Sequence, residues 1–215
     1  MKTEYVSIIF LISLIFFASF SSKAENNYLK INYGITSSNV EATAAVGTIT
    51  TDSDDEGFML SAGGLIGDFW GIDLMYYDLG DTKITVTSDD TITVNKANFS
   101  TGKTNGDITR NTTGFGLGLI AAGSSEEGFL GLDYYLKLGV HAWDRDGSTT
   151  LLLDNDGFKS KYYTQGIGAY GGIGVSLNIY QNTSLDLAYD LIGISSNASF
   201  ENNSTLASAG LRVKF

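Results

Sequence analysis

Apolar and polar side chains alternate along most of the chain, in segments of about ten residues separated by polar stretches. In the clearest segment, residues 130–141, Leu, Tyr and Val occupy the even positions, while Gly, Asp, Tyr, Lys and His occupy the odd ones. A period of two is typical of a β-strand with one apolar face. Eight segments are predicted strands: 28–35, 58–66, 69–79, 113–122, 130–141, 163–178, 185–191 and 205–215.

The connections between these segments alternate in length. Short turns are predicted at 67–68, 123–128 and 180–183, and long connections at 36–57, 80–112, 143–162 and 193–204. Short periplasmic turns and long extracellular loops are typical of outer-membrane barrels. We therefore predict an all-β fold, an eight-stranded antiparallel up-and-down transmembrane β-barrel with both termini at the periplasm. A soluble β-sandwich, which alternates in the same way, is the other interpretation.

The second long connection contains two β-rich runs, 83–87 and 91–95, on either side of Ser-Asp-Asp. This pattern predicts a hairpin above the membrane. Its free edge would recruit a partner strand by β-augmentation, or the hairpin would be a decorated loop without a partner. If the hairpin were inserted in the sheet, the barrel would have ten strands.

The first residues follow a different pattern. Residues 6–20 form an apolar run interrupted only by Ser, after Lys2 and before the small residues Ser22 and Ala24. This is the layout of a secretory signal peptide, and the run is shorter than the roughly 20 residues of a membrane-spanning helix. We predict a signal peptide at 1–24 and a barrel domain at 25–215; an uncleaved anchor is the alternative.

Composition narrows the function classes. The chain has 24 acidic and 13 basic residues and no Cys, with a net charge of −11. This charge argues against nucleic acid as a partner, because phosphate binding needs clustered Lys and Arg. The absence of Cys excludes disulfides, Cys-ligated metals and thiol catalysis.

The two faces of the predicted strands differ in chemistry. The bulky apolar face would contact lipid, with aromatic residues such as Trp70, Tyr76 and Tyr189 in girdles at the membrane interfaces. The other face carries Gly and eight charges, which would lie in the lumen: Lys30, Asp73, Asp133, Lys137, Asp186, Asp190, Arg212 and Lys214. Because eight strands leave little interior space, a structural network of ion pairs is favoured over a conducting path.

The final strand and several strand ends resemble the OmpA-like and OmpX-like family of small outer-membrane barrels. The pattern Leu211, Val213, Phe215 resembles the C-terminal assembly signal of such barrels, and the segments 76–81, 137–144 and 171–177 resemble their strand motifs. The resemblance implies a Gram-negative outer membrane, contact with its lipids and lipopolysaccharide, and insertion by the barrel-assembly machinery through Phe215. It also implies adhesion or host-surface contact through the loops. The peptidoglycan-binding module of OmpA is not expected here.

Few residues suggest catalysis or metal binding. His141 would need a nucleophile or a carboxylate nearby to act as a general base, and Trp143 stands where the outer-membrane deacylases would have Ser, so a rim histidine is favoured. The Asp-x-Asp-Gly segments 144–147 and 154–157 offer oxygen ligands for Ca²⁺ but lack the remaining ligands of an EF-hand. The acids within 51–56 are interpreted as a solvated loop tip. No catalytic, cofactor or metal site is predicted.

The sequence thus predicts a non-enzymatic outer-membrane protein that contributes to envelope structure and displays acidic extracellular loops for surface interaction or adhesion. A small porin-like channel is the first alternative, and an outer-membrane lipid-modifying enzyme is the second.

Overall fold

The computed structural model of the protein describes residues 27–38, 42–44, 47–52, 54–66, 68–88, 92–94, 97–99, 104–125, 131–153, 156–194 and 203–215. The predicted signal peptide lies outside them. The strands are β1 (Asn27–Ser38), β2 (Ala42–Ala44), β3 (Gly47–Asp52), β4 (Asp54–Leu65), β5 (Trp70–Ser88), β6 (Ile92–Val94), β7 (Ala97–Phe99), β8 (Thr104–Ser124), β9 (Leu132–Leu153), β10 (Asp156–Tyr180), β11 (Thr183–Gly193) and β12 (Asn203–Lys214).

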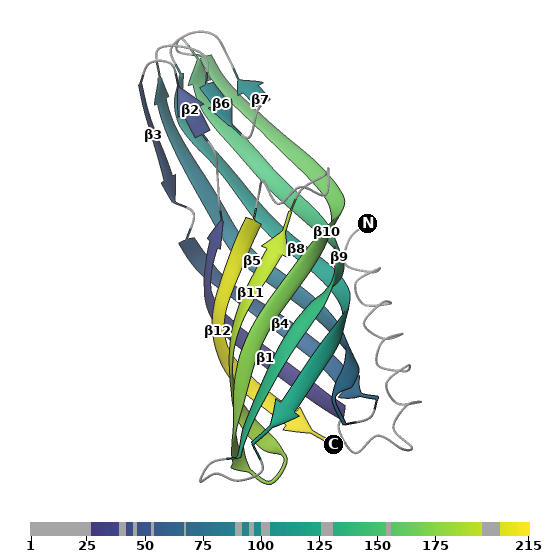
Figure 1. The fold of residues 1–215 in the computed structure, drawn as a ribbon. Coiled ribbons are helices and arrows are strands. Elements are labelled where there is room, and N and C mark those ends of the chain that lie inside the picture. Colours follow the sequence, from purple (N-terminus) through teal and green to yellow (C-terminus); the bar gives the residue numbers. More distant parts are fainter. Residues whose placement is uncertain are drawn as a thin grey trace.

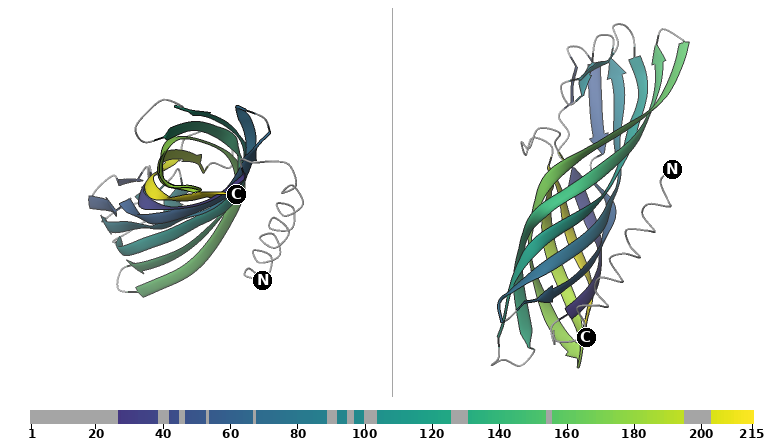
Figure 2. Two further views of the ribbon diagram at one scale, coloured as in Figure 1. Left: turned by 90° about the horizontal axis from the view of Figure 1, so that it is seen from below. Right: turned by 90° about the vertical axis from the view of Figure 1, so that its right-hand side faces the viewer.

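Eight of these strands close a barrel, as the alternation predicts. Each of β1, β4, β5, β8, β9, β10, β11 and β12 pairs antiparallel with its neighbours, and the β1–β12 pairing closes the ring. Figure 1 shows the tilted strands wrapping around one another in the lower half of the molecule. Seen along its length, this part is a closed ring (Figure 2, left). The prediction of an eight-stranded up-and-down barrel is confirmed, and the ten-stranded alternative is wrong.

The outer surface of the ring is apolar. The side chains of Leu138 and Ile167 are 68% and 72% exposed, and the outward positions within 29–35, 132–140 and 185–191 are exposed Leu, Ile, Tyr or Val. The inward positions of the same strands are buried. A closed sheet pairs its backbone groups internally, which is the condition for crossing hydrocarbon. The apolar face therefore contacts lipid, and the soluble-sandwich interpretation is wrong.

Among the described residues, no helix has the length and hydropathy that a membrane crossing requires.

Four strands continue far beyond the lipid-facing part. β5, β8, β9 and β10 have 19, 21, 22 and 25 residues, whereas a membrane strand needs about 9–11. Together with β3 they form a curved sheet above the barrel, visible at the top of Figure 1 and at the upper right of Figure 2. We call this part the extracellular sheet, after the predicted topology in which both termini lie at the periplasm. Much of 80–112 and 143–162, predicted as loops, is therefore strand. These stretches were interpreted as loops because their outer faces are polar, although Ile84, Val86 and Ile108 alternate with polar residues and are buried on the inner face.

The predicted hairpin within residues 83–95 is wrong. Residues 83–88 continue β5 and pair with both β3 and β8. β6 instead pairs with β2 and β7, in a separate three-stranded sheet at the tip of the molecule. Each run has the β propensity that was expected, but propensity carries no information about which strand is the partner.

A β-bulge marks the point where β5 leaves the barrel. The register with β8 shifts between Asp78 and Asp81. Within the bulge, Gly80 has a φ of 71° and donates its N–H to Asp78 Oδ1 at 2.9 Å. A positive φ favours Gly because it has no Cβ, and a bulge increases the local twist of a strand. The bulge therefore lies where the closed ring opens into the extracellular sheet.

Candidate functional site

The lumen of the barrel holds the eight predicted charges, and the first group surrounds Asp186. Lys30 Nζ lies 3.4 Å from Asp186 Oδ2, and both side chains are almost fully buried. The Tyr135 hydroxyl donates to the same carboxylate at 2.9 Å and accepts from Lys30 at 2.7 Å. Asn32 and Ser176 also donate to Asp186, at 2.8 and 2.6 Å. This carboxylate is thus held by one cation and three neutral donors.

The second group joins Lys137 to Asp190. Their nitrogen and oxygen lie 2.8 Å apart, and each side chain is 1% exposed. Neither oxygen of Asp190 has a hydrogen bond of favourable geometry, so the contact is chiefly Coulombic. Lys137 Nζ also lies 3.2 Å from the sulfur of Met59. Gly172 on β10 lies between the two residues and pairs with both, and a Cβ there would collide with the Asp190 carboxylate.

The remaining charges lie toward the end of the barrel that is opposite the extracellular sheet. Asp133 forms ion pairs with Lys214 and with Arg212, the latter at 3.8 Å. The Arg212 guanidinium stacks 4.6 Å from the centre of the Tyr28 ring. The Tyr28 hydroxyl donates to Asp73 at 2.5 Å. Strand pairing thus brings together cations and anions that are far apart in the sequence.

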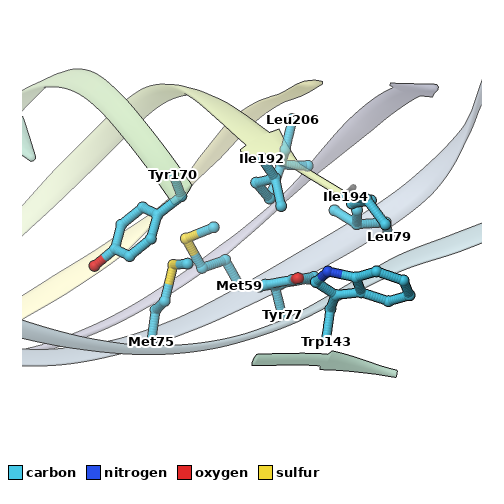
Figure 3. Close-up of a cluster of buried hydrophobic side chains, with 9 residues drawn as sticks. All are labelled: Met59, Met75, Tyr77, Leu79, Trp143, Tyr170, Ile192, Ile194 and Leu206. Carbon is cyan, nitrogen blue, oxygen red and sulfur yellow. The ribbon is translucent and has the colours of Figure 1, made fainter. Parts of the chain in front are cut away.

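Apolar and aromatic side chains fill the outer half of the lumen. Figure 3 shows this cluster, which consists of Met59, Met75, Tyr77, Leu79, Trp143, Tyr170, Ile192, Ile194 and Leu206. The Tyr170 ring lies over the inner faces of β9 and β8, since a Cβ on Gly116, Gly118 or Gly139 would press against it. Small residues on β8 and β9 therefore make room for one large ring from β10.

His141 lies at the edge of this cluster and is buried. Its Nδ1 lies 2.7 Å from the Tyr77 hydroxyl, and its Nε2 lies 2.9 Å from the carbonyl oxygen of Gly193. Both ring nitrogens are thus engaged by a phenol and a backbone carbonyl. The predicted rim position is wrong, because the strand continues outward and places His141 inside the barrel.

The predicted girdle and assembly residues lie on the lipid-facing surface. Trp70 and Tyr189 are exposed there. Tyr76 packs between the rings of Phe58 and Phe115, with centroids 5.8 and 4.8 Å away. The C-terminal side chains of the predicted assembly signal also point outward: Leu211, Val213 and Phe215.

The first Asp-x-Asp-Gly segment is part of a strand. Asp144 and Asp146 are exposed on the outer face of β9, and Arg145 between them faces inward. The Tyr163 hydroxyl donates to Asp144 at 2.5 Å, and this hydrogen bond raises the pKa of Tyr163 to about 12. The described residues contain no group of three His, Cys, Asp or Glu placed to hold a metal ion. Asp154 lies outside them.

The acids predicted as a loop tip are divided between two strands. Asp52 ends β3, and Asp54, Asp55 and Glu56 begin β4. The Asp55 carboxylate accepts from the backbone N–H of Asp81 at 2.5 Å, beside the bulge. The loop-tip interpretation is therefore wrong, since one of these acids helps to shape the junction.

A cluster that was not predicted from the sequence lies on the inner face of the extracellular sheet. Arg110, Thr112 and Trp143 are buried there, and Arg145 is half-buried. Their segments were interpreted as loops, so the alternation that places them on one face was not considered. Residues 108, 110 and 112 are alternate positions, so they share one face if this segment is a strand. That spacing is the sequence signal that could have revealed the cluster.

Comparisons with known proteins give structural matches alone. No protein-family model and no curated protein matches the chain. It is similar to the outer membrane protein OprG of Pseudomonas aeruginosa, with 16% identity, a TM-score of 0.48, and coverage of 89% of this chain and 97% of that one. It is also similar to Ail, the attachment invasion locus protein of Yersinia pestis, with 14% identity, a TM-score of 0.46, and coverage of 88% and 99%. The match to Neisserial surface protein A has 20% identity, a TM-score of 0.44, and coverage of 90% and 100%. Matches at this level assign no function.

Proposed function

We propose that the protein is a non-enzymatic component of a Gram-negative outer membrane that presents its extracellular sheet for surface contact and adhesion. One contrast carries the proposal. The lumen is filled by buried side chains, whereas four strands extend far beyond the length that a membrane requires. The extension has no role in crossing the membrane, so we infer that it acts outside the cell.

The filled lumen argues against the channel alternative. Tyr28, Tyr77, Tyr170 and Lys137 are among the largest fully buried side chains, and they point into the interior. Eight strands enclose just enough space for side chains to fill. Opening a path would separate ion pairs that are already desolvated, which costs several kcal/mol for each unpaired charge.

The surroundings of His141 give no support to the hydrolase alternative. A general base in hydrolysis acts on a nucleophile and is oriented by a further group, often a carboxylate. His141 Nδ1 instead lies beside the Tyr77 hydroxyl, and its Nε2 lies beside the carbonyl oxygen of Gly193. A buried phenol that faces the lumen core is not placed to attack a lipid or a peptide.

The route to the surface follows from the sequence signals. The predicted signal peptide would direct export, and Phe215 at the end of the last strand would be read by the barrel-assembly machinery. Outer-membrane lipids and lipopolysaccharide would then cover the apolar face. Residues 144 and 146 carry exposed carboxylates just above this face, in keeping with an acidic outer surface.

Adhesion of cells that express the protein tests the proposal. The variant replaces residues 147–162, the outer part of β9 and β10, by a short turn, and the control is Leu138→Val on the lipid-facing surface. We expect the full chain and the control to raise attachment to cultured epithelial cells, and the trimmed variant to have no effect at equal outer-membrane abundance. Equal attachment by the trimmed variant would refute surface contact through this sheet. Conductance steps in planar bilayers would favour the channel.

A further inference from the structure

Two arginines lie close together on the inner face of the extracellular sheet, just above the barrel. Arg110 on β8 pairs with Gly147 of β9, and Thr112 pairs with Arg145. The two arginines are thus diagonal neighbours on one face. Arg110 is 6% exposed and Arg145 is half-buried.

No carboxylate among the described residues forms an ion pair with either guanidinium. The neighbouring acids point to the opposite face: Asp144 and Asp146 are exposed outside, and Asp107 pairs with Lys83 at 3.0 Å. Burial, together with the nearby charge of Arg110, lowers the pKa of Arg145 to about 10. Two like charges therefore share a partly desolvated place, which is unfavourable unless an anion joins them.

Further donors surround the pair. Arg145 Nε donates to Thr112 Oγ1 at 3.1 Å, and its guanidinium lies 5.6 Å from the centre of the Trp143 ring. The indole Nε1 of Trp143 is buried and has no acceptor among the described residues, although buried N–H groups are nearly always hydrogen-bonded. Tyr162 lies over Gly147, where a Cβ would collide with its ring. Donors are thus in excess at this place and acceptors are scarce.

We propose that this cluster binds a tetrahedral oxyanion, a sulfate or phosphate group, either free or as the ester of a larger molecule. A guanidinium fork matches two oxygens of such a group, and two forks on neighbouring strands bind it from two sides. The anion would neutralise the two buried positive charges and accept from otherwise unpaired N–H groups. The chain as a whole is acidic, with a net charge of −11, so anion binding would be local to this cluster. The inference does not depend on adhesion.

The fluorescence of Trp143 provides a local readout of binding. The chain has two Trp residues, and Trp70 lies exposed at the other end of the barrel. The full barrel with Trp70→Phe is refolded in a neutral detergent, so that Trp143 is its one tryptophan. The fluorescence of Trp143 then reports on movement of the Arg145 guanidinium beside its ring. Inorganic phosphate and inorganic sulfate are the probes, titrated at constant ionic strength with chloride as the balancing anion.

We expect saturable binding that weakens at least tenfold in Arg110→Gln and in Arg145→Gln. The matched control is Lys159→Gln, which removes an exposed cation from the opposite face of the same sheet and should leave the affinity unchanged. If a Gln variant fails to fold, Arg145→Lys keeps the charge and loses the fork, and it should still weaken binding. Absence of saturation, or an equal loss in Lys159→Gln, would overturn the proposal.

Two further arms identify the source of the anion. A sugar sulfate that binds more tightly than inorganic sulfate would indicate an ester on a glycan. Tighter binding in micelles that contain a phosphate-bearing lipid would indicate a lipid headgroup. Equal affinity for free and esterified anions would indicate that the free ion is the ligand.

Discussion

Replacing Lys137 by Met removes the cation from one of the two almost fully buried ion pairs of the lumen. The nitrogen lies 2.8 Å from Asp190 Oδ1, and each side chain is 1% exposed. With an effective dielectric constant of about 20, two unit charges at this distance attract by about 6 kcal/mol. The cost of desolvating both charges opposes this attraction. In the variant, however, the Asp190 carboxylate stays buried and desolvated without its cation. We therefore expect Lys137→Met to lower the free energy of unfolding by about 3–5 kcal/mol.

Replacing the other partner of the pair, in Asp190→Asn, should lower the free energy of unfolding by a smaller amount. Lys137 also interacts electrostatically with Asp73 and Asp186, so in Asp190→Asn the lysine keeps two carboxylates nearby. In Lys137→Met, by contrast, Asp73 and Asp190 face each other without that cation. The double variant Lys137→Met/Asp190→Asn should be more stable than the sum of the two single losses predicts, by about 2 kcal/mol or more.

Urea unfolding of the barrel in lipid bilayers, followed by tryptophan fluorescence, measures these free energies. Leu138→Met, on the lipid-facing side of the same strand, is the matched control and should change stability by less than about 1 kcal/mol. Strictly additive losses in the double-mutant cycle, or a loss below about 1 kcal/mol in Lys137→Met, would refute the view that a desolvated ion pair holds the lumen closed.

Three further substitutions test other features of the fold by the same measurement. Gly80→Ala should lower the free energy of unfolding by about 1–2 kcal/mol, because a Cβ is strained at a φ of 71°. The control Gly171→Ala should be nearly neutral, because its Cβ would meet no atom closer than 3.5 Å. Equal losses in the two variants would show that backbone strain at Gly80 is not the cause. Tyr28→Phe should cost about 1–3 kcal/mol because it removes the donor from a buried carboxylate, whereas Tyr189→Phe on the exposed face should cost almost nothing. Hydrogen bonds from its neighbours lower the pKa of Asp107, so the stability it contributes is present at neutral pH and is lost as the pH falls through about 4 and below. Asp107→Asn should therefore be less stable than wild type at pH 7, by less than about 1 kcal/mol because solvent screens the exposed pair. At pH 2 the two proteins should be equally stable. A stability difference that grows as the pH falls would contradict the expected pH dependence.

The sequence alone determined the barrel and the side of the sheet on which each residue of its strands lies. Alternation is a local property, because successive side chains of a strand point to opposite faces. It therefore predicted that Lys30 and Asp186 share the interior, and that Leu138 and Ile167 face outward. The alternating lengths of the connections added the topology.

The tertiary structure alone decided which residues meet. Lys30 reaches Asp186, and Lys137 reaches Asp190, because closure of the ring and the stagger of its strands bring these positions to the same depth. The extracellular sheet was missed for a related reason. The inner face of its strands buries apolar side chains such as Ile84, Val86 and Ile108, but no local pattern records which strand pairs with which. Alternation could place Arg110 on the inner face, but the pairing of β8 with β9 is what brings it beside Arg145.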